Sequence, residues 1–286
     1  MPTKIEKDAI TGTLTTGHEW DGIKELNTPL PKWWIYVFYA CIAWSAVYVV
    51  LYPSLPWIGG TLGWSRRAEL TETINAERER VKPLLDRIKA TSAEEVQKAA
   101  DLRDFSIAGG RAAFADNCAP CHGSGGAGAK GGFPALVDDE WIWGGSLEQI
   151  ERTIRYGVRS AHAETRQSQM PRFGIDALLT PAQIADVAEH VLSLTGRATA
   201  IASATRGRPL YADMCAACPG DSGQGNKELG APSLADRIWL YGSDKASIER
   251  SIYTGRGGVM PAWTDRLDET TIRMLTIYVQ SLGGGR

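Results

Sequence analysis

The sequence predicts an all-α protein, with one N-terminal transmembrane helix followed by two tandem copies of a small helical domain. Three observations support this fold class. One segment near the N-terminus is long, apolar and uncharged. The charged segment that follows it has apolar residues at helical spacing. The rest of the chain is a repeated sequence with almost no alternating strand pattern. The length of 286 residues leaves room for two small domains, and the net charge of −2 gives no reason to expect a polyanion such as nucleic acid as a partner.

Residues 33–52 are the predicted membrane anchor. They carry no charge and are long enough to cross about 30 Å of hydrocarbon as a helix. Aromatic residues mark both ends, with Trp33 and Trp34 before and Tyr52 and Trp57 after, as in interfacial belts. A buried core helix would rarely run so long without a charge, and a signal peptide would not follow the polar, carboxylate-bearing residues 1–32. We therefore predict an uncleaved single-pass anchor in a lipid bilayer.

Residues 53–104 form the next predicted segment, a charged helical linker. Glu, Lys, Arg and Ala dominate it from residue 69 onward. Apolar residues recur there at helical spacing, namely Ile74, Val81, Leu84, Leu85 and Ile88. We expect one amphipathic helix or a pair of such helices that carries the following domains away from the bilayer. We expect no catalytic or ligand-binding role for this segment.

The remainder of the chain is a tandem duplication. The first copy (residues 105–195) and the second copy (207–286) share, in order, a Gly-rich loop, an aromatic segment, an Ile-Glu-Arg-x-Ile helix, a Met-Pro pair and a final helix ending in Ser-Leu. Residues 196–206 between them are rich in Ala, Thr and Ser without an apolar period, and are the predicted linker. Units this short bury little core of their own, so a large apolar cofactor would supply the missing packing.

Cys118, Cys121 and His122 form a Cys-x-x-Cys-His motif, the attachment site of c-type haem. Thiols at i and i+3 lie on one side of a helical turn, so both can reach the vinyl groups of one porphyrin edge. The histidine that follows then places its imidazole at the iron. A thioredoxin-like redox pair would need a strand–helix–strand context, and a zinc ribbon would need its second cysteine pair about 15–20 residues away. The sequence therefore predicts covalent haem c.

Each copy also contains a methionine followed by proline, Met170 and Met260. A thioether opposite a histidine gives six-coordinate iron of high potential, which carries electrons and has no open site for oxygen. Methionine can simply fill a gap in a core, but two of only five methionines stand at matching positions. We expect both to be axial ligands, and the sequence leaves open which haem each serves. His18, His162 and His190 are not expected to be ligands, and His190 is expected on a helix surface.

The second copy departs from the motif at one position, because Cys215 and Cys218 are followed by Pro219. Proline has no imidazole, and it restricts the preceding residue away from helical angles. Three interpretations stay open. The second haem is absent and the domain vestigial, or it is attached with its proximal ligand missing or replaced, or Pro219 is a variant or an error, since a single-base change separates the codons. The other residues of the second attachment site are intact, which favours a recent or artificial change at position 219.

Residues 15–34, TTGHEWDGIKELNTPLPKWW, closely resemble the N-terminal signature of the diheme cytochrome c subunit (FixP/CcoP, subunit III) of cbb3-type cytochrome c oxidases. The resemblance extends over the whole chain, because anchor, charged helix and tandem haem domains follow in the same order. It implies two haem c groups. The covalent attachment residues are then Cys118, Cys121, Cys215 and Cys218, the axial ligands are His122, Met170 and Met260, and Pro219 occupies the position of the second proximal histidine.

Three further residues belong to the haem pocket that the resemblance implies. The Pro134 carbonyl is expected to accept a hydrogen bond from His122 Nδ1–H, which would orient the ring and tune the iron. Arg155 and Tyr156 are the candidates to contact the haem propionates.

The resemblance implies an electron-transfer subunit that does not itself reduce oxygen. Electrons would come from a donor cytochrome c or the bc1 complex and pass, through a monohaem cytochrome subunit, to the haem–copper catalytic subunit. Lys and Arg flank both ends of the anchor and give no direction. Because bacterial haem c is attached outside the inner membrane, we expect the N-terminus in the cytoplasm and the haem domains in the periplasm. The alternatives are an independent membrane-anchored electron shuttle and a redox or haem sensor. Carbon monoxide binding is the discriminating test, because carbon monoxide should not bind a haem with His and Met ligands but could bind a defective second haem.

Overall fold

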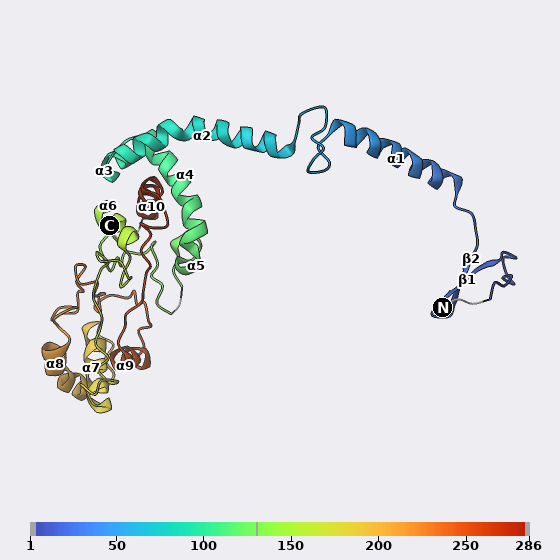
Figure 1. The fold of residues 1–286 in the computed structure, drawn as a ribbon. Helices are drawn as coiled ribbons and strands as arrows, with labels where there is room; N and C mark the ends of the chain where they lie inside the picture. Colours follow the sequence, from blue (N-terminus) through green and yellow to red (C-terminus); the bar gives the residue numbers. More distant parts are fainter. Residues whose placement is uncertain (1–3, 130, 284–286) are drawn as a thin grey trace. The chain divides into compact units, whose positions relative to one another are not determined.

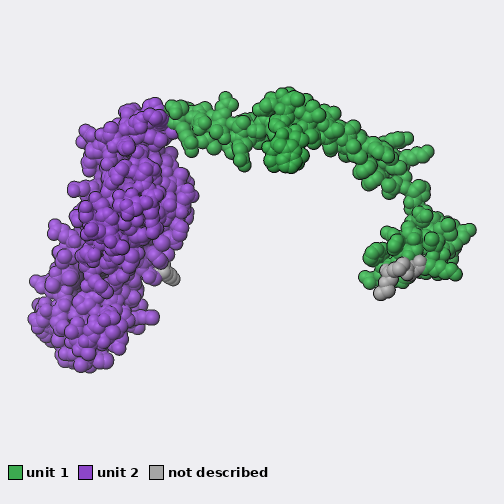
Figure 2. Space-filling view, viewed as in Figure 1, with its two compact units in different colours: residues 1–80 green, residues 81–286 purple. Residues whose placement is uncertain are grey.

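The computed structural model describes residues 4–129 and 131–283. Figure 2 colours its two compact units, Met1–Arg80 and Val81–Arg286. Apart from one small hairpin, the regular secondary structure of the described residues is helical, which confirms the predicted all-α class. One small addition is a two-stranded antiparallel hairpin, β1 (Thr15–Trp20) and β2 (Ile23–Leu26). Asp21 and Gly22 join the strands with φ of 48° and 82°, and such an Asp-Gly turn is a strong hairpin signal in a sequence.

Helix α1 (Lys32–Leu51) follows the hairpin in the first unit. None of its residues is buried, although tryptophan, tyrosine, phenylalanine and valine side chains lie all around it. A helix that is apolar on every face and uncovered by protein is suited to lipid. Among the described residues it is the one helix long and apolar enough to cross a membrane.

Helices α2 (Arg66–Ala90) and α3 (Ala93–Lys98) lie in the segment predicted as a charged linker. Ser92 begins α3 with a capping box, because its hydroxyl accepts from Glu95 N and the Glu95 carboxylate accepts from Ser92 N. Ile88 at the end of α2 is fully buried with Val96, Leu102 and Ile277. The last turns of α2 are therefore part of the core of the second unit.

Seven further helices form the rest of the described second unit, apart from a short 3₁₀ turn, η1 (Ser124–Gly126). They are α4 (Ala100–Asn117), α5 (Ala119–His122), α6 (Leu147–Tyr156), α7 (Pro181–Leu194), α8 (Ile201–Met214) and α9 (Lys245–Thr254), with α10 (Glu269–Ser281) closing the chain. The extensive helix contacts are between α4 and α10, between α7 and α8, between α6 and α10 and between α7 and α9.

The two sequence copies therefore exchange their final helices (Figure 1). We call α4, α6 and α10 the first module, and α8, α9 and α7 the second module. Two glycines permit the close helix crossings. A Cβ added at Gly110 on α4 would lie 2.2 Å from Met274 O on α10, and one at Gly207 on α8 would lie 2.0 Å from Asp186 O on α7. The ranges 105–195 and 207–286 thus describe repeats along the chain, whereas each spatial module draws on both.

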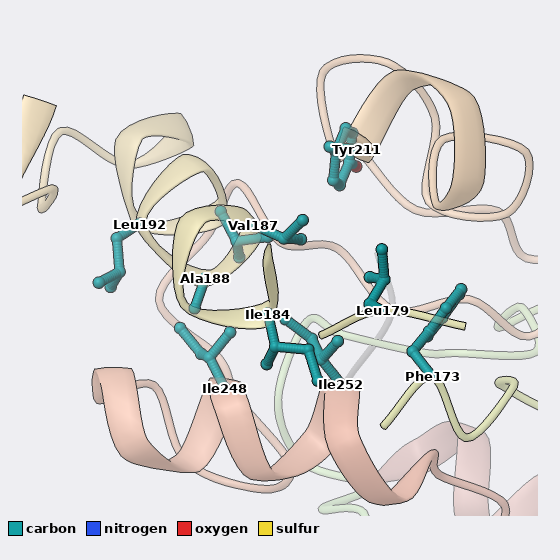
Figure 3. Close-up of a cluster of buried hydrophobic side chains, with 10 residues drawn as sticks. Phe173, Leu179, Ile184, Val187, Ala188, Leu192, Tyr211, Ile248 and Ile252 are labelled. Atoms are coloured by element: carbon teal, nitrogen blue, oxygen red, sulfur yellow. The ribbon is translucent and has the colours of Figure 1, made fainter. Parts of the chain in front are cut away.

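Each module has its own hydrophobic core. The first contains Phe114, Trp141, Ile150, Ile154, Ile272, Leu275, Tyr278 and Val279. The second contains Phe173, Leu179, Ile184, Val187, Ala188, Val191, Leu192, Tyr211, Ile248 and Ile252. Figure 3 shows Ile248 and Ile252 on α9 directed toward Ile184 and Ala188 of α7. Both cores thus combine helices that lie far apart in the sequence.

Helix α8 begins at Ile201, inside the stretch predicted to be a linker. The reason lies in α7, whose Glu189 side chain has no exposed surface. Its carboxylate accepts hydrogen bonds from Thr199 N at 2.9 Å and Ala200 N at 3.1 Å, two backbone groups at the start of α8. Because this cap comes from another helix, no local pattern in residues 196–206 could reveal it.

Candidate functional site

The attachment motif of the first copy lies where α4 ends and α5 begins. Cys118 closes α4, with its N–H donating to Phe114 O at 2.8 Å, and His122 N donates to Cys118 O at 2.9 Å. Cys118 is half-buried against the first core, whereas Cys121 is exposed. A single helical turn thus holds both thiols and the imidazole, which is the arrangement that one porphyrin edge requires.

His122 is oriented by the loop that follows it. Its Nδ1 lies 3.0 Å from the Pro134 carbonyl oxygen, the contact expected from the sequence. A carbonyl can only accept, so Nδ1 carries the proton and the lone pair is on Nε2. The ring is therefore held in the tautomer that leaves Nε2 available to a metal.

The methionines lie in the modules of the opposite copies. Met260 packs against the first core together with Cys118, and Met170 packs against the second core together with Cys215. Backbone pairing fixes this exchange, because Val158 N donates to Met260 O at 3.0 Å and Met260 N donates to Val158 O at 2.9 Å. The matching contact in the second module is Met170 N donating to Arg256 O at 3.2 Å.

Two glycines make room for these methionine loops. A Cβ added at Gly157, where α6 ends, would lie 2.3 Å from Met260 O. One added at Gly255, where α9 ends, would lie 2.6 Å from Met170 O. Both glycines also have positive φ, 69° and 68°. The helix ends of each copy are thus shaped to receive the methionine of the other.

A continuous cavity of about 800 Å³ contains both attachment motifs and both methionines. Cys118, Cys121, His122 and Met260 line it beside apolar side chains of the first core, including Trp141, Ile150, Ile154, Leu275 and Val279. Thiols, an imidazole and a thioether at the edges of an apolar cavity are the donor set of an electron-transfer haem c. The residues of the first module fit that group.

The second site keeps its loop geometry although Pro219 replaces histidine. Gly225 N donates to Pro219 O at 2.8 Å, where Gly128 N donates to His122 O at 2.6 Å in the first site. Leu234 N donates to Gly223 O at 2.6 Å, as Leu136 N donates to Gly126 O at 2.7 Å. Cys215, Cys218 and Met170 line the cavity as well. This site therefore fits a covalently attached porphyrin but offers no imidazole from its own motif.

Burial raises the pKa of the free Cys118 and Cys215 thiols to about 11 each, with a smaller contribution from the neighbouring cysteine of each pair. Both thiols are therefore neutral near pH 7 before attachment.

Arg155 and Tyr156, predicted to contact propionates, are not among the residues that line the cavity. Arg155 donates instead to Glu151 at 2.7 Å and to Glu269 at 2.5 Å, and Tyr156 stacks on His162 with ring centroids 4.8 Å apart. Glu269 is on α10, so the exchange of helices supplies this competing partner. The described arginines that do line the cavity are Arg159 and Arg256.

His190 is buried, at 9% exposure, so the expectation of a surface position was wrong. Helix α8 covers it, and its ring lies 5.0 Å from that of Tyr211. Burial lowers the pKa of His190, with a smaller effect from Arg208. Tyr211 was missed as a site residue. It lines the cavity and its hydroxyl donates to Gly220 O at 2.8 Å, and alignment of the two copies, which pairs it with Phe114, could have identified it.

Comparisons with known proteins match three parts of the chain, in order. Residues 12–59 match the N-terminal domain of cytochrome oxidase-cbb3, FixP, residues 107–195 match cytochrome c, and residues 202–279 match cytochrome c oxidase, cbb3-type, subunit III. Full-length relatives agree with this order. The CcoP subunit of a cbb3-type cytochrome c oxidase from Azospirillum brasilense is 50% identical over 98% of this chain and 99% of its own length. FixP subunits from Bradyrhizobium sp. (strain ORS 278) and Rhizobium meliloti (strain 1021) are 50% and 45% identical, covering 100% and 97% of both sequences.

Proposed function

This chain belongs to the FixP/CcoP family of cbb3-type cytochrome c oxidase subunits, and from that premise we propose that it is the subunit through which electrons enter the oxidase. It is a haem c protein of the inner membrane, its two cytochrome c domains fit two haems, and its partners include other subunits of the oxidase. The proposed donor is a soluble or membrane-bound cytochrome c or the bc1 complex. The proposed route runs through a monohaem cytochrome subunit to the haem–copper subunit, where oxygen is reduced.

The observation that carries this proposal is the pairing of His122 and Met260 in one module. Bound haem c supplies one-electron redox chemistry. Cys118 and Cys121 would attach it covalently, with His122 and Met260 as its two axial ligands. Iron with both axial positions filled by protein carries electrons and leaves no position for oxygen.

The chain's own residues tune this site. The Pro134 carbonyl fixes the His122 ring and increases the basicity of Nε2. Trp141 closes one wall of the cavity and is itself fixed, because its indole N–H donates to Asp138 O at 3.0 Å. Apolar walls of this kind keep water from the iron, which favours the less charged, reduced state and raises the potential.

For the second site we propose covalent attachment through Cys215 and Cys218, with Met170 on one face and no imidazole from position 219. The equivalent loop hydrogen bonds around Pro219 support a folded attachment site. Such a haem would have one axial position open to small ligands, unlike the first.

We propose further that the N-terminus lies in the cytoplasm and the haem modules in the periplasm, where haem c is attached. The match of residues 12–59 to the FixP N-terminal domain supports a fixed oxidase subunit over an independent shuttle.

The test is oxygen consumption by the purified oxidase complex containing this chain. A Cys118→Ala, Cys121→Ala double variant should lose oxygen consumption with reduced cytochrome c as donor, while a small reductant that reaches the catalytic subunit directly should still support it. Full activity of that variant with cytochrome c would contradict the proposed entry point. If the chain fails to co-purify with the catalytic subunit, the independent shuttle is the better description.

A further inference from the structure

The Arg159 side chain donates hydrogen bonds to both methionine-bearing loops. Its Nε donates to Gly258 O at 2.6 Å and its Nη1 donates to Ser168 O at 2.5 Å. Gly258 stands two residues before Met260, and Ser168 stands two residues before Met170. One guanidinium therefore holds the two loops at equivalent positions.

From this geometry we propose that Arg159 is a positioning residue that ties the two loops together and governs how firmly both methionines hold their haems. The inference rests on the proposed function, in which Met260 and Met170 are axial ligands. Movement of either loop would carry its methionine away from the iron, and both loops are anchored through the same guanidinium.

The surrounding backbone places Arg159 at the crossing of the two copies. Its neighbour Val158 pairs with Met260 through two backbone hydrogen bonds, and Arg256, in the corresponding segment of the second copy, accepts from Met170 N. Arg159 N donates to Arg166 O at 2.9 Å, which secures the base of the side chain. Arg159 and Gly258 belong to different sequence copies, so the contact between them exists only because the copies are intertwined.

Arg159 is also conformationally unusual. Its φ is 51°, in the left-handed region that residues other than glycine rarely occupy. Such a conformation persists when the surroundings impose it, and it often accompanies a functional role. Among the described residues, the guanidinium of Arg159 donates to the two loop carbonyls and forms no ion pair with a carboxylate.

The chemistry of arginine explains why this residue type suits the position. A guanidinium presents several N–H donors in a rigid plane and can serve two acceptors in different directions at once. A lysine keeps the charge but has a single nitrogen on a flexible stem, so it cannot hold both carbonyls in the same geometry. A glutamine at this position removes the charge and shortens the reach.

The test compares Arg159→Gln and Arg159→Lys with a matched control, Arg166→Gln, in the full-length haem-loaded protein. Arg166 likewise donates to a hydroxyl and a carbonyl, Thr153 Oγ1 at 2.9 Å and Gln149 O at 3.2 Å, but it does not line the cavity. The readouts are the long-wavelength absorption band that a thioether gives ferric haem and the rate at which cyanide displaces the methionine. Urea unfolding of each variant reports global stability.

We expect cyanide to displace Met260 about tenfold faster in Arg159→Gln, the effect of losing hydrogen bonds from a charged donor. Arg159→Lys should be intermediate, and Arg166→Gln should match the parent. In a Pro219→His background, where both sites have an imidazole, Arg159→Gln should accelerate both displacement phases.

Three results would overturn the inference. The first is equal cyanide rates in the parent, Arg159→Gln and Arg166→Gln. The second is an acceleration in Arg159→Gln that Arg166→Gln reproduces at the same loss of urea stability, because that pattern indicates general destabilisation. The third is the absence of the thioether band from the parent itself, which contradicts the proposed axial ligands as well. The first two leave the proposed function intact, so the two failures are distinguishable.

Discussion

Val158 and Met260 belong to different sequence copies, yet their backbones exchange two hydrogen bonds, of 3.0 Å and 2.9 Å. This pairing brings a methionine of the second copy to the attachment motif of the first. The reciprocal contact, Met170 N to Arg256 O, does the same for the second motif. The two haem modules of this oxidase subunit are therefore interdependent.

The crossing of α4 and α10 should tolerate no side chain at Gly110. A Cβ there would lie 2.2 Å from Met274 O and 2.7 Å from Tyr278 Cβ, and the backbone oxygen cannot rotate away. We expect Gly110→Ala to destabilise the second unit by about 2–3 kcal/mol, as overpacking does. Urea unfolding followed by circular dichroism measures the effect.

Gly109→Ala is the matched control, on the same helix turn. A Cβ at Gly109 would meet Met274 Sδ at 2.7 Å, the far end of a flexible side chain that can move. We expect this substitution to cost less than about 1 kcal/mol, since alanine also favours the helix. Equal losses in the two variants would mean that the α4–α10 crossing is not the close contact described.

The buried carboxylate of Glu189 should make stability depend on pH. A hydrogen bond from Lys245, followed by the N–H groups of Ala200 and Thr199, lowers the pKa of Glu189 to about 2 from 4.5. Because the folded-state pKa is depressed, the stabilisation is fully present above pH 4.5 and is lost as pH falls toward 2. Lys245 is partly exposed, so we expect a contribution of about 2 kcal/mol.

Glu189→Gln should remove that contribution near neutral pH and flatten the decline in stability below pH 4.5. Urea midpoints measured across this pH range, in parallel for the parent and the variant, give the comparison. A variant whose stability falls with acid as steeply as that of the parent would show that Glu189 is not the responsible group.

Pro219 should leave the second haem open to carbon monoxide. We expect the reduced protein to bind carbon monoxide at one of its two haems, because under the proposed ligation the first would have both axial positions filled and the second would lack the imidazole. Pro219→His should abolish this binding, since the loop hydrogen bonds already match those of the first site. Pyridine haemochrome analysis of both proteins controls for haem content. A parent with a single covalent haem and no carbon monoxide binding would indicate a vestigial second site.

The local features of this molecule could be predicted from the sequence, and the long-range ones could not. The Cys118–His122 motif occupies one helical turn, and α1 is an uninterrupted apolar run, so each is visible in a short window. The exchange of α7 and α10 depends on contacts between copies that look alike, and nothing in either copy indicates which partner is preferred.

The same limit applies to individual side chains. His190 lies on a helix whose covering partner, α8, could not be seen in its own periodicity. Arg155 is paired with Glu269, a residue of the other copy, and so does not reach the cavity. The role inferred for Arg159 depends on two carbonyls from different copies, which only the folded arrangement brings together.

The most direct measurement is the thioether absorption band of the ferric full-length protein, compared between Met260→Ala and Met170→Ala. Under the proposed ligation the first haem alone would have both an imidazole and a thioether, so the band would report the thioether ligand of the haem at His122. We expect Met260→Ala to abolish the band and Met170→Ala to retain it, because Met260 packs with Cys118 in the first module. Loss of the band in Met170→Ala with retention in Met260→Ala would contradict the exchanged arrangement.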